Sequence, residues 1–146
     1  MNLKVINQYF SICKVEDLSK VDFSDKFCFI SKTDEEFSLV CSSKLVPKNI
    51  IECDHGWKAF RIQGVLDFSL IGILSRITTI LSESGIGIFA VSTYNTDYIL
   101  TKKDNFDKVI KLYEKFGFVK VGYHKDYFNI EGKYDDLILM DLCLDK

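Results

Sequence analysis

At 146 residues the chain can form one ordinary domain or two small ones that share a sheet, and its 47% hydrophobic content is enough for a core. Nineteen basic and twenty-one acidic side chains give a formal charge of −2, which disfavours attraction to nucleic acid or to an anionic membrane. The N-terminus lacks the apolar core of a signal peptide and no apolar run approaches the ~20 residues that span a bilayer, so we expect a soluble, cytoplasmic protein.

The first part of the chain, to about Asp54, is predicted to be rich in strands. Two runs of aromatic and branched residues, FCFISK and EFSLVCSS, flank the turn-forming residues Thr33 and Asp34 and predict a hairpin. Pro47 and the polar stretch PKNIIECDHG then mark a connection, and Gly56 precedes a new predicted strand, WKAFRIQG. We place a domain boundary near this glycine.

The segment after this strand has the spacing of an amphipathic helix that lies on a sheet. Its apolar residues follow the helical period, with polar residues on the other side. The apolar set is Leu70, Ile73, Leu74, Ile77, Ile80 and Leu81, and the polar set is Ser75, Arg76, Thr79, Ser82 and Glu83. Asp67 or Ser69 can cap the start of this helix, and Gly85 suits the left-handed residue just beyond its end.

Two further strands, IGIFAVSTY and DYILTK, precede a second predicted helix over residues 105–116, which Asp104 caps and Gly117 ends. The run FVKVGY is predicted to be the next strand, so the order is strand, helix, strand, strand, helix, strand, as in a ferredoxin-like domain. A turn around Glu131 and Gly132, a solvated acidic turn at Asp135 and Asp136, and a last strand should follow. No repeat at a fixed period is visible in the sequence.

The metal-ligating residue types are scattered along the chain. Five cysteines stand at positions 13, 28, 41, 53 and 143 without a C-x-x-C spacing, which predicts small buried apolar side chains in a reducing compartment. His55 and His124 lie far apart and have no carboxylate or cysteine at ligand spacing, which predicts surface residues near turns. We therefore predict neither a metal site nor a cofactor.

The stretch from about Phe37 to Leu100 resembles the ACT-domain family, and specifically the tandem ACT proteins related to the cytosolic arginine sensors of animals and their small bacterial relatives. The residues that carry this resemblance are EFSLVC and HGWKAFRIQGVLDFSLIGILSRITTILSESGIGIFAVSTYNTDYIL. The resemblance implies non-catalytic binding of a small amino acid, with the loop between the first strand and the first helix contacting the ligand. It also implies a ligand-contacting role for Asp97.

Two segments are candidates for the ligand site. In LDFSLIG, backbone N–H groups at a helix start could bind an α-carboxylate, and Gly72 would allow close approach; the alternative is an ordinary capped helix. In STYNTDY, Asp97 could pair with an ammonium or guanidinium group; the alternative is a plain hairpin turn. The candidate ligand-binding residues are Asp67, Phe68, Ser69, Gly72, Ser92, Thr93, Asn95, Thr96 and Asp97.

The stretch from Asn105 to the end resembles the C-terminal part of GNAT-family acetyltransferases, on the residues NFDKVIKLYEKFGFVKVG and KDYFNIEGKYDDLILMDLCL. Tyr113 matches the position of a tyrosine that this family uses as general acid, and Asn105 matches an asparagine near its cofactor. The family's glycine-rich pyrophosphate loop has no counterpart in this sequence. We therefore favour a structural role for this segment and predict no catalytic residue.

Together these observations predict an α+β protein of tandem ferredoxin-like (ACT) units, with an antiparallel sheet and helices on one face. The expected parts are an abbreviated unit over residues 1–55, an ACT domain over residues 56–122 and a strand extension over residues 123–146. The predicted function is regulatory binding of a small amino acid by a homodimer, since open edge strands favour side-by-side pairing. An acetyl-CoA-dependent N-acetyltransferase and a partner-binding interaction module are the alternatives.

Overall fold

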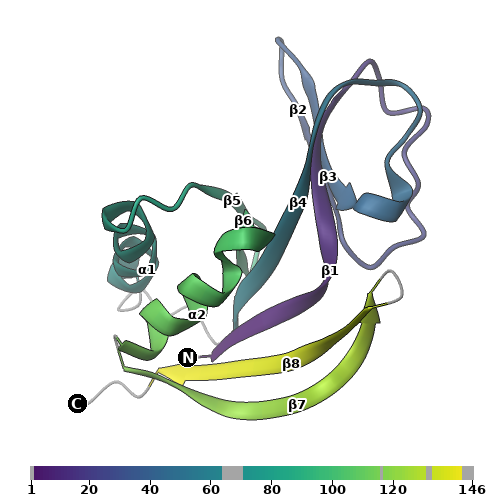
Figure 1. Ribbon diagram of the computed structural model, residues 1–146. Helices are drawn as coiled ribbons and strands as arrows, with labels where there is room; N and C mark the ends of the chain where they lie inside the picture. The colour runs from purple at the N-terminus through teal and green to yellow at the C-terminus, as the bar shows by residue number, and fades with distance from the viewer. Residues whose placement is uncertain (1, 64–70, 116, 131–132, 143–146) are drawn as a thin grey trace. The chain divides into compact units, whose positions relative to one another are not determined.

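The computed structural model describes residues 2–63, 71–115, 117–130 and 133–142, and shows an α+β chain (Figure 1). Strands predominate, and they pair antiparallel wherever a register is defined. In chain order the elements are β1 (Asn2–Val15), β2 (Cys28–Lys32), β3 (Phe37–Ser42), the 3₁₀ turn η1 (Ser43–Leu45), β4 (Ile50–Gln63), α1 (Ile71–Glu83), β5 (Ile88–Ser92), β6 (Asp97–Lys102), the 3₁₀ turn η3 (Lys103–Asn105), α2 (Phe106–Lys115), β7 (Phe118–Ile130) and β8 (Lys133–Leu142).

The chain divides into two compact units. We call Gln8–Trp57 the N-terminal unit, and we call Met1–Asn7 together with Lys58–Lys146 the C-terminal unit. Strands β1 and β4 each contribute residues to both units. The domain bounds that the sequence suggested, after residues 55 and 122, stay a prediction.

The N-terminal unit is a sheet in the order β2-β3-β1-β4. Its predicted hairpin is confirmed, because β2 and β3 pair antiparallel and the Thr33 backbone N–H donates to the Glu36 carbonyl at 3.0 Å. Residues 16–27, which join β1 to β2, form turns and bends rather than a helix. One buried core cluster of this unit contains Cys13, Val15, Leu39 and Cys41.

Strand β4 begins earlier than the sequence indicated. The predicted strand started at Trp57 after a polar connection, whereas β4 starts at Ile50 and continues through Gly56. Gly56 has a φ of 82°, which a glycine adopts at little cost, so it accommodates a local distortion inside the strand without ending it. The prediction that His55 lies near a turn is therefore wrong, since His55 is part of this strand.

The C-terminal unit contains the predicted order of strand, helix, strand, strand, helix, strand in β4, α1, β5, β6, α2 and β7. Its strand pairing differs from that of a ferredoxin-like sheet, in which the last strand, here β7, would lie beside β4. Strand β1 lies next to β4, on the side away from β6, while β7 pairs with β8 and β8 pairs with Asn2, Leu3 and Lys4 of β1. Strand β1 can take this place because Leu3 and Val5 alternate along it and supply two core side chains.

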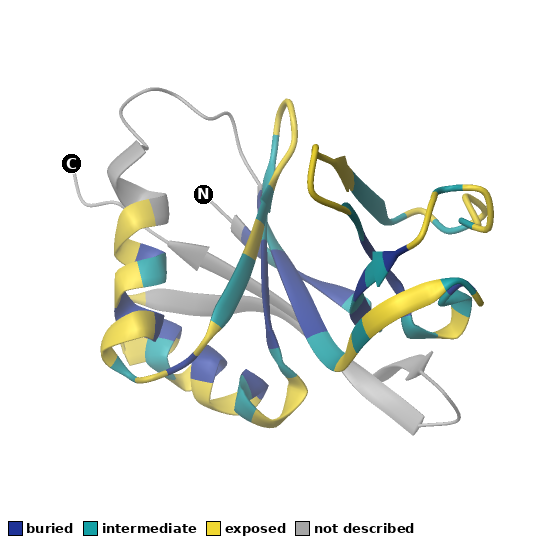
Figure 2. Ribbon diagram, turned by 90° about the horizontal axis from the view of Figure 1, so that it is seen from above, coloured by how far each residue is buried: buried dark blue, intermediate teal, exposed yellow. Residues whose placement is uncertain are grey.

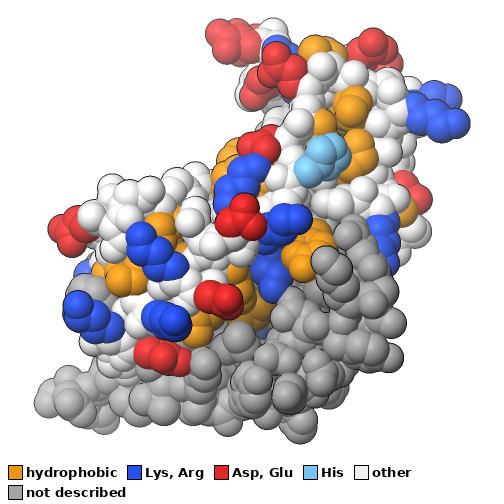
Figure 3. All heavy atoms as spheres, in the orientation of Figure 1, with side chains coloured by type: hydrophobic (Ala, Val, Ile, Leu, Met, Phe, Trp, Pro, Cys, Tyr) orange, Lys and Arg blue, Asp and Glu red, His pale blue; other side chains and the backbone are white. Residues whose placement is uncertain are grey.

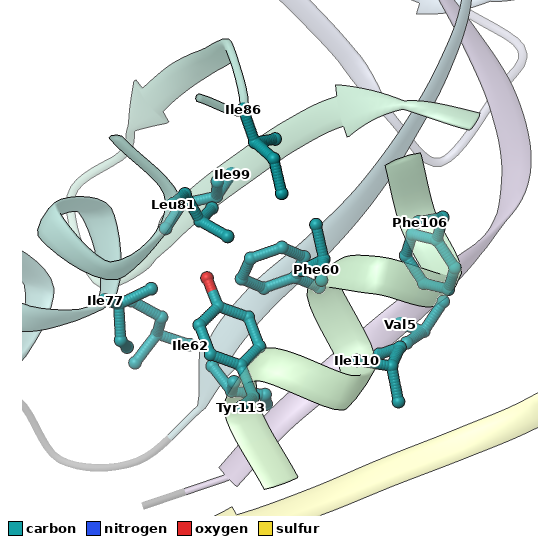
Figure 4. Packing of buried hydrophobic residues seen from close by; sticks show 12 residues of the cluster. Val5, Phe60, Ile62, Ile77, Leu81, Ile86, Ile99, Phe106, Ile110 and Tyr113 are labelled. Carbon is teal, nitrogen blue, oxygen red and sulfur yellow. The ribbon is translucent and has the colours of Figure 1, made fainter. Parts of the chain in front are cut away.

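Both helices cover one face of the strands in the C-terminal unit. The alternate residues Phe60 and Ile62 of β4 share a buried cluster with Ile77 and Leu81 of α1, and α2 contributes Tyr113 to the same cluster (Figure 4). Each helix has its buried residues on one side and its exposed residues on the other (Figure 2). The remaining members of the cluster are Leu3, Val5, Ile86, Ile99, Phe106, Val109 and Ile110.

The described part of α1 confirms the predicted faces and the predicted end of the helix. Ile77, Ile80 and Leu81 are buried. All five predicted polar residues are exposed, namely Ser75, Arg76, Thr79, Ser82 and Glu83. At the C-terminus the N–H of Ile86 donates to the carbonyl of Leu81 at 2.9 Å and that of Gly85 donates to Ser82 at 3.0 Å. These two bonds form a Schellman motif.

Replacing Gly85 by alanine should destabilise the protein by roughly 1–2 kcal/mol, because a side chain in the left-handed region is strained. Gly85 has a φ of 71° and its Cβ position meets no atom within 4 Å, so backbone strain is the cause and steric overlap is not. Gly87→Ala is the matched control: the space at Gly87 is equally open and its backbone is not left-handed. Chemical denaturation of both variants measures the difference, and equal stabilities would contradict the motif.

The second helix starts one residue later than predicted, directly after a 3₁₀ turn. Asp104 lies inside η3, and α2 begins at Phe106, so Asp104 does not cap the helix as predicted. The predicted end is confirmed, since Gly117 has a φ of 100° and donates to the Glu114 carbonyl at 3.2 Å. Asp135, predicted to form an acidic turn with Asp136, instead pairs with Phe128 within the β7–β8 ladder.

A local structure occurs twice in the chain, although no repeat was visible in the sequence. Strands β2 and β3 and the 3₁₀ turn η1 start at residues 28, 37 and 43, and β5, β6 and η3 start at residues 88, 97 and 103. Every element of the second set therefore lies sixty residues after its counterpart and has the same length. The turns also correspond, because Thr33 and Thr93 each donate a backbone N–H to the carbonyl three residues later.

Candidate functional site

The described part of the predicted site is the hairpin turn between β5 and β6. Ser92 and Asp97 are the last cross-strand pair of this hairpin. The Thr93 backbone N–H donates to the Thr96 carbonyl at 2.8 Å, and the Thr93 hydroxyl donates to the same oxygen at 3.0 Å. The turn thus brings five predicted residues together, namely Ser92, Thr93, Asn95, Thr96 and Asp97.

The Asp97 carboxylate is held by its neighbour across the hairpin. The Ser92 hydroxyl donates to Asp97 Oδ1 at 2.6 Å, a short bond of the kind that hydroxyls make with carboxylates. Asp97 is half-buried, whereas Ser92, Thr93 and Asn95 are exposed. The hydrogen bond fixes the orientation of a carboxylate that solvent still reaches, so this geometry suits both a ligand contact and a turn contact.

The other part of the predicted site lies mostly outside the described residues. Asp67, Phe68 and Ser69 belong to the segment 64–70, about which the structure gives no description. Gly72 is the second residue of α1. The predicted meeting of this segment with Asp97 therefore stays a prediction.

An open hollow of about 560 Å³ at the C-terminal end of α1 was not foreseen from the sequence. Three hydroxyl side chains, two glycines and two isoleucines line it: Thr78, Thr79, Ser82, Gly85, Ile86, Gly87 and Ile88. The hydroxyl of Thr78 already donates to the Ser75 carbonyl at 3.1 Å. The sequence signal that could have indicated this hollow is the presence of hydroxyl residues next to glycines, because glycines have no side chain and leave the backbone accessible.

The electrostatics of the described surface match the small net charge. Acidic and basic side chains are intermingled on the face that Figure 3 shows, without a large patch of one sign. Across the side chains that the structure describes, no group of three or more His, Cys, Asp or Glu residues is placed to hold a metal ion. The visible face thus offers no strongly charged platform for a polyanion.

The structure gives Tyr113 a structural role in the core. Its side chain is 1% exposed and its ring packs edge-on against Phe60, with the ring centroids 5.5 Å apart (Figure 4). Burial raises the pKa of the Tyr113 hydroxyl well above its usual value, so this group holds its proton near neutral pH. A buried phenol with a raised pKa is poorly placed to act as the general acid of acetyl transfer.

The cysteines of the N-terminal unit agree in part with the sequence interpretation. Cys13 and Cys41 are buried, Cys28 and Cys53 are half-buried, and all four are free thiols. Cys143 lies outside the described residues, as does the side chain of His124. No pattern in the sequence indicated that Cys13 and Cys53, which are separated by forty positions, would lie in contact.

Comparison with known families finds a match to the ACT domain over residues 52–114. This region begins within β4 and ends within α2, so it includes α1 and the β5–β6 hairpin. A search of curated proteins gave no match. Among the described residues, no helix has the length and apolar character needed to cross a membrane.

Three solved structures are similar to this chain. An Agobacterium tumefaciens protein is 32% identical, with a TM-score of 0.70, and the alignment covers 77% of this chain and 86% of that one. A Vibrio cholerae protein of unknown function, described as a possible transport protein, is 16% identical with a TM-score of 0.54 over 75% and 84% of the two chains. Clostridium acetobutylicum aspartate kinase, described as an allosteric enzyme, is 15% identical with a TM-score of 0.53 over 75% of this chain and 32% of the kinase.

Proposed function

We propose that this chain is a regulatory ACT-domain protein that binds a small amino acid without catalysing a reaction, from the premise that its residues 52–114 match the ACT domain. The observation that carries the proposal is the ACT-domain match, which includes α1 and the β5–β6 hairpin and ends within α2. The similarity to aspartate kinase supports the fold of this region. The resemblance to amino-acid sensors then suggests the class of ligand.

We propose that the ACT unit is present in tandem, with the N-terminal unit as an abbreviated copy. The hairpin and 3₁₀ turn repeated at a spacing of sixty residues support this proposal. The strand order β2-β3-β1-β4 of the N-terminal unit supports it as well, because it is the order of a ferredoxin-like sheet in which residues 16–27 and 43–49 stand where the two helices would be.

In the proposed site, Asp97 binds the cationic group of the ligand, and backbone N–H groups of residues 67–72 bind its carboxylate. The half-buried carboxylate and its hydrogen bond to Ser92 support the role of Asp97, because a charged group that is already oriented loses little entropy on binding. Strand β5 ends the order of the sheet, and such an edge supports pairing of two copies as a homodimer.

A thermal-shift screen of the twenty amino acids tests the proposed function. An amino acid present at a hundred times its dissociation constant should add about 2.7 kcal/mol to the free energy of unfolding and raise the melting temperature accordingly. Absence of a shift with every amino acid would count against sensing. Tight binding of acetyl-CoA in calorimetry would instead favour the acetyltransferase alternative, and a stable assembly indifferent to amino acids in native mass spectrometry would favour an interaction module.

Asp97→Asn should weaken binding of the amino acid found in that screen by about tenfold to a hundredfold, because a hydrogen bond to a charged group contributes roughly 1.5–3 kcal/mol. Asparagine keeps an oxygen that can accept from Ser92, so the hairpin should persist and the melting temperature of the free protein should change little. Calorimetric titration and melting of the same samples measure both effects.

Two controls separate a ligand contact from a turn contact. Ser92→Ala removes the hydroxyl donor and keeps the Asp97 charge. It should therefore reduce the free energy of unfolding, and with it the melting temperature, by more than it reduces the free energy of ligand binding. Asp34→Asn changes an exposed acidic residue in the corresponding turn of the N-terminal unit and should affect neither. Unchanged affinity in well-folded Asp97→Asn protein would remove Asp97 from the site.

A further inference from the structure

Three adjacent strands of the N-terminal unit place reactive side chains on one face of the sheet. Strand β1 contributes Ser11 and Cys13, and β4 contributes Cys53 and His55, each pair two residues apart and therefore on one side of its strand. Cys41 lies directly across from Ser11 on β3. These side chains form a continuous set of contacts at the edge of the core of this unit.

Within this set, the Cys13 thiol contacts two neighbouring thiols, those of Cys41 and Cys53. The Sγ atoms of Cys13 and Cys53 lie 3.0 Å apart, and a disulfide has an S–S length of about 2.05 Å, so a movement of about 1 Å would close the bond. Cys13 is 2% exposed, whereas Cys53 is half-buried at the rim of the cluster. A small reagent from solvent can therefore reach Cys53 but not Cys13.

We propose that Cys13 and Cys53 form a reversible intramolecular disulfide, which makes the N-terminal unit a site of thiol oxidation by low-molecular-weight disulfides. In the first step the Cys53 thiolate attacks one sulfur of the small disulfide, forms a mixed disulfide and releases one small thiol. In the second step the Cys13 sulfur attacks Cys53 Sγ and displaces the second small thiol. Two protein thiols are oxidised and one small disulfide is reduced to two thiols.

His55 is placed to assist the first step. Its Nδ1 lies 3.8 Å from Cys53 Sγ and 2.7 Å from the Ser11 hydroxyl, which in turn lies 2.8 Å from the Ser43 hydroxyl. The imidazole is exposed and can pass the Cys53 proton to solvent. His55 therefore acts as a positioning and proton-accepting residue for Cys53 and does not form a bond to sulfur.

The cross-link would have a defined structural consequence. It joins β1 to β4 and encloses the β2–β3 hairpin, because Cys13 and Cys53 lie forty positions apart. A cross-link across such a loop restricts the unfolded chain and raises stability. Oxidation should therefore raise the melting temperature of the protein, and reduction should reverse the change.

The experiment treats the reduced, full-length protein with oxidised glutathione, blocks the remaining thiols with N-ethylmaleimide, and identifies cross-linked peptides by mass spectrometry. We expect a monomer that has lost two hydrogens, with peptides containing Cys13 and Cys53 joined to each other, and full recovery of both thiols after treatment with dithiothreitol. Cys53→Ala should abolish this product. Cys28→Ala is the matched control, since Cys28 is equally half-buried in the same unit, and it should leave the product intact.

Three results would overturn the proposal: a cross-link to Cys41 from either Cys13 or Cys28, a cross-link between two chains, or only glutathione adducts. Because Cys13→Ala alters the core and could unfold the protein, His55→Gln provides a second readout at an exposed position. This variant should reach the same end point more slowly, whereas an unchanged rate would remove His55 from the step. The test is independent of the proposed amino-acid ligand, since no amino acid is added.

Discussion

Phe60→Ala is expected to lower the free energy of unfolding by about 3–5 kcal/mol, the range observed when a large buried aromatic side chain is truncated. Phe60 is 2% exposed and lies on β4 in the cluster between the strands and both helices (Figure 4). Its ring also packs edge-on against Tyr113, with an interplanar angle of 79°, so truncation removes an aromatic pair as well as apolar area. Urea denaturation followed by circular dichroism measures the loss.

A control on the same strand separates core packing from a general effect on β4. Ile51 is 54% exposed, and Ile51→Ala should change stability by no more than about 0.5 kcal/mol. Phe60→Leu keeps most of the apolar volume and should cost clearly less than Phe60→Ala, which keeps the comparison measurable if the alanine variant unfolds. If Phe60→Ala and Ile51→Ala lowered the free energy of unfolding by the same amount, Phe60 would not occupy the core as described.

The second large effect concerns the pH dependence of Cys53, and it rests on the proposed disulfide. Raising the pH from 7 to 9 should accelerate the reaction of Cys53 with oxidised glutathione about a hundredfold, because the thiolate is the reacting form and its fraction grows tenfold per pH unit below the pKa. Burial, followed by the contact with Cys13, raises the pKa of the Cys53 thiol to about 12.

The groups around Cys53 determine the sign of this effect. Its contact with Cys13 and the nearby Asp54 carboxylate favour the neutral thiol, the Ser11 hydroxyl favours the thiolate, and His55 Nδ1 lies 3.8 Å away. An ordinary cysteine, with a pKa near 8.5, would level off above about pH 9. The rate of Cys53 should keep rising to about pH 10 while free glutathione levels off in parallel measurements. A plateau above about pH 9, as for an ordinary cysteine, would contradict the raised pKa.

The sequence predicted the local elements well, because each depends on residues that are close together along the chain. Periodic apolar positions located both helices, and Gly85 and Gly117 marked their ends because both adopt a positive φ. The β2–β3 and β5–β6 hairpins followed from turn residues between short apolar runs. Predictions that relied on a single polar residue were less successful, and Asp104 lies in a 3₁₀ turn where a helix cap was expected.

The candidate site was likewise predictable only in the part that depends on residues close together along the chain. The sequence identified Ser92 and Asp97 as residues of one turn, but only the structure showed that the serine hydroxyl donates to the carboxylate, because that bond depends on the register of β5 and β6. The hollow at the end of α1 was missed because it requires the helix terminus and β5 to come together.

By itself the sequence determined the α+β class, the helix faces, the hairpins and the resemblance to ACT domains, since propensity, period and turn chemistry act over a few residues. Only the tertiary structure decided that β1 lies beside β4, that the hairpin recurs sixty residues later, and that Cys13 meets Cys53. Pairing between distant strands depends on which apolar faces are buried together across the whole chain. No local pattern specifies that choice.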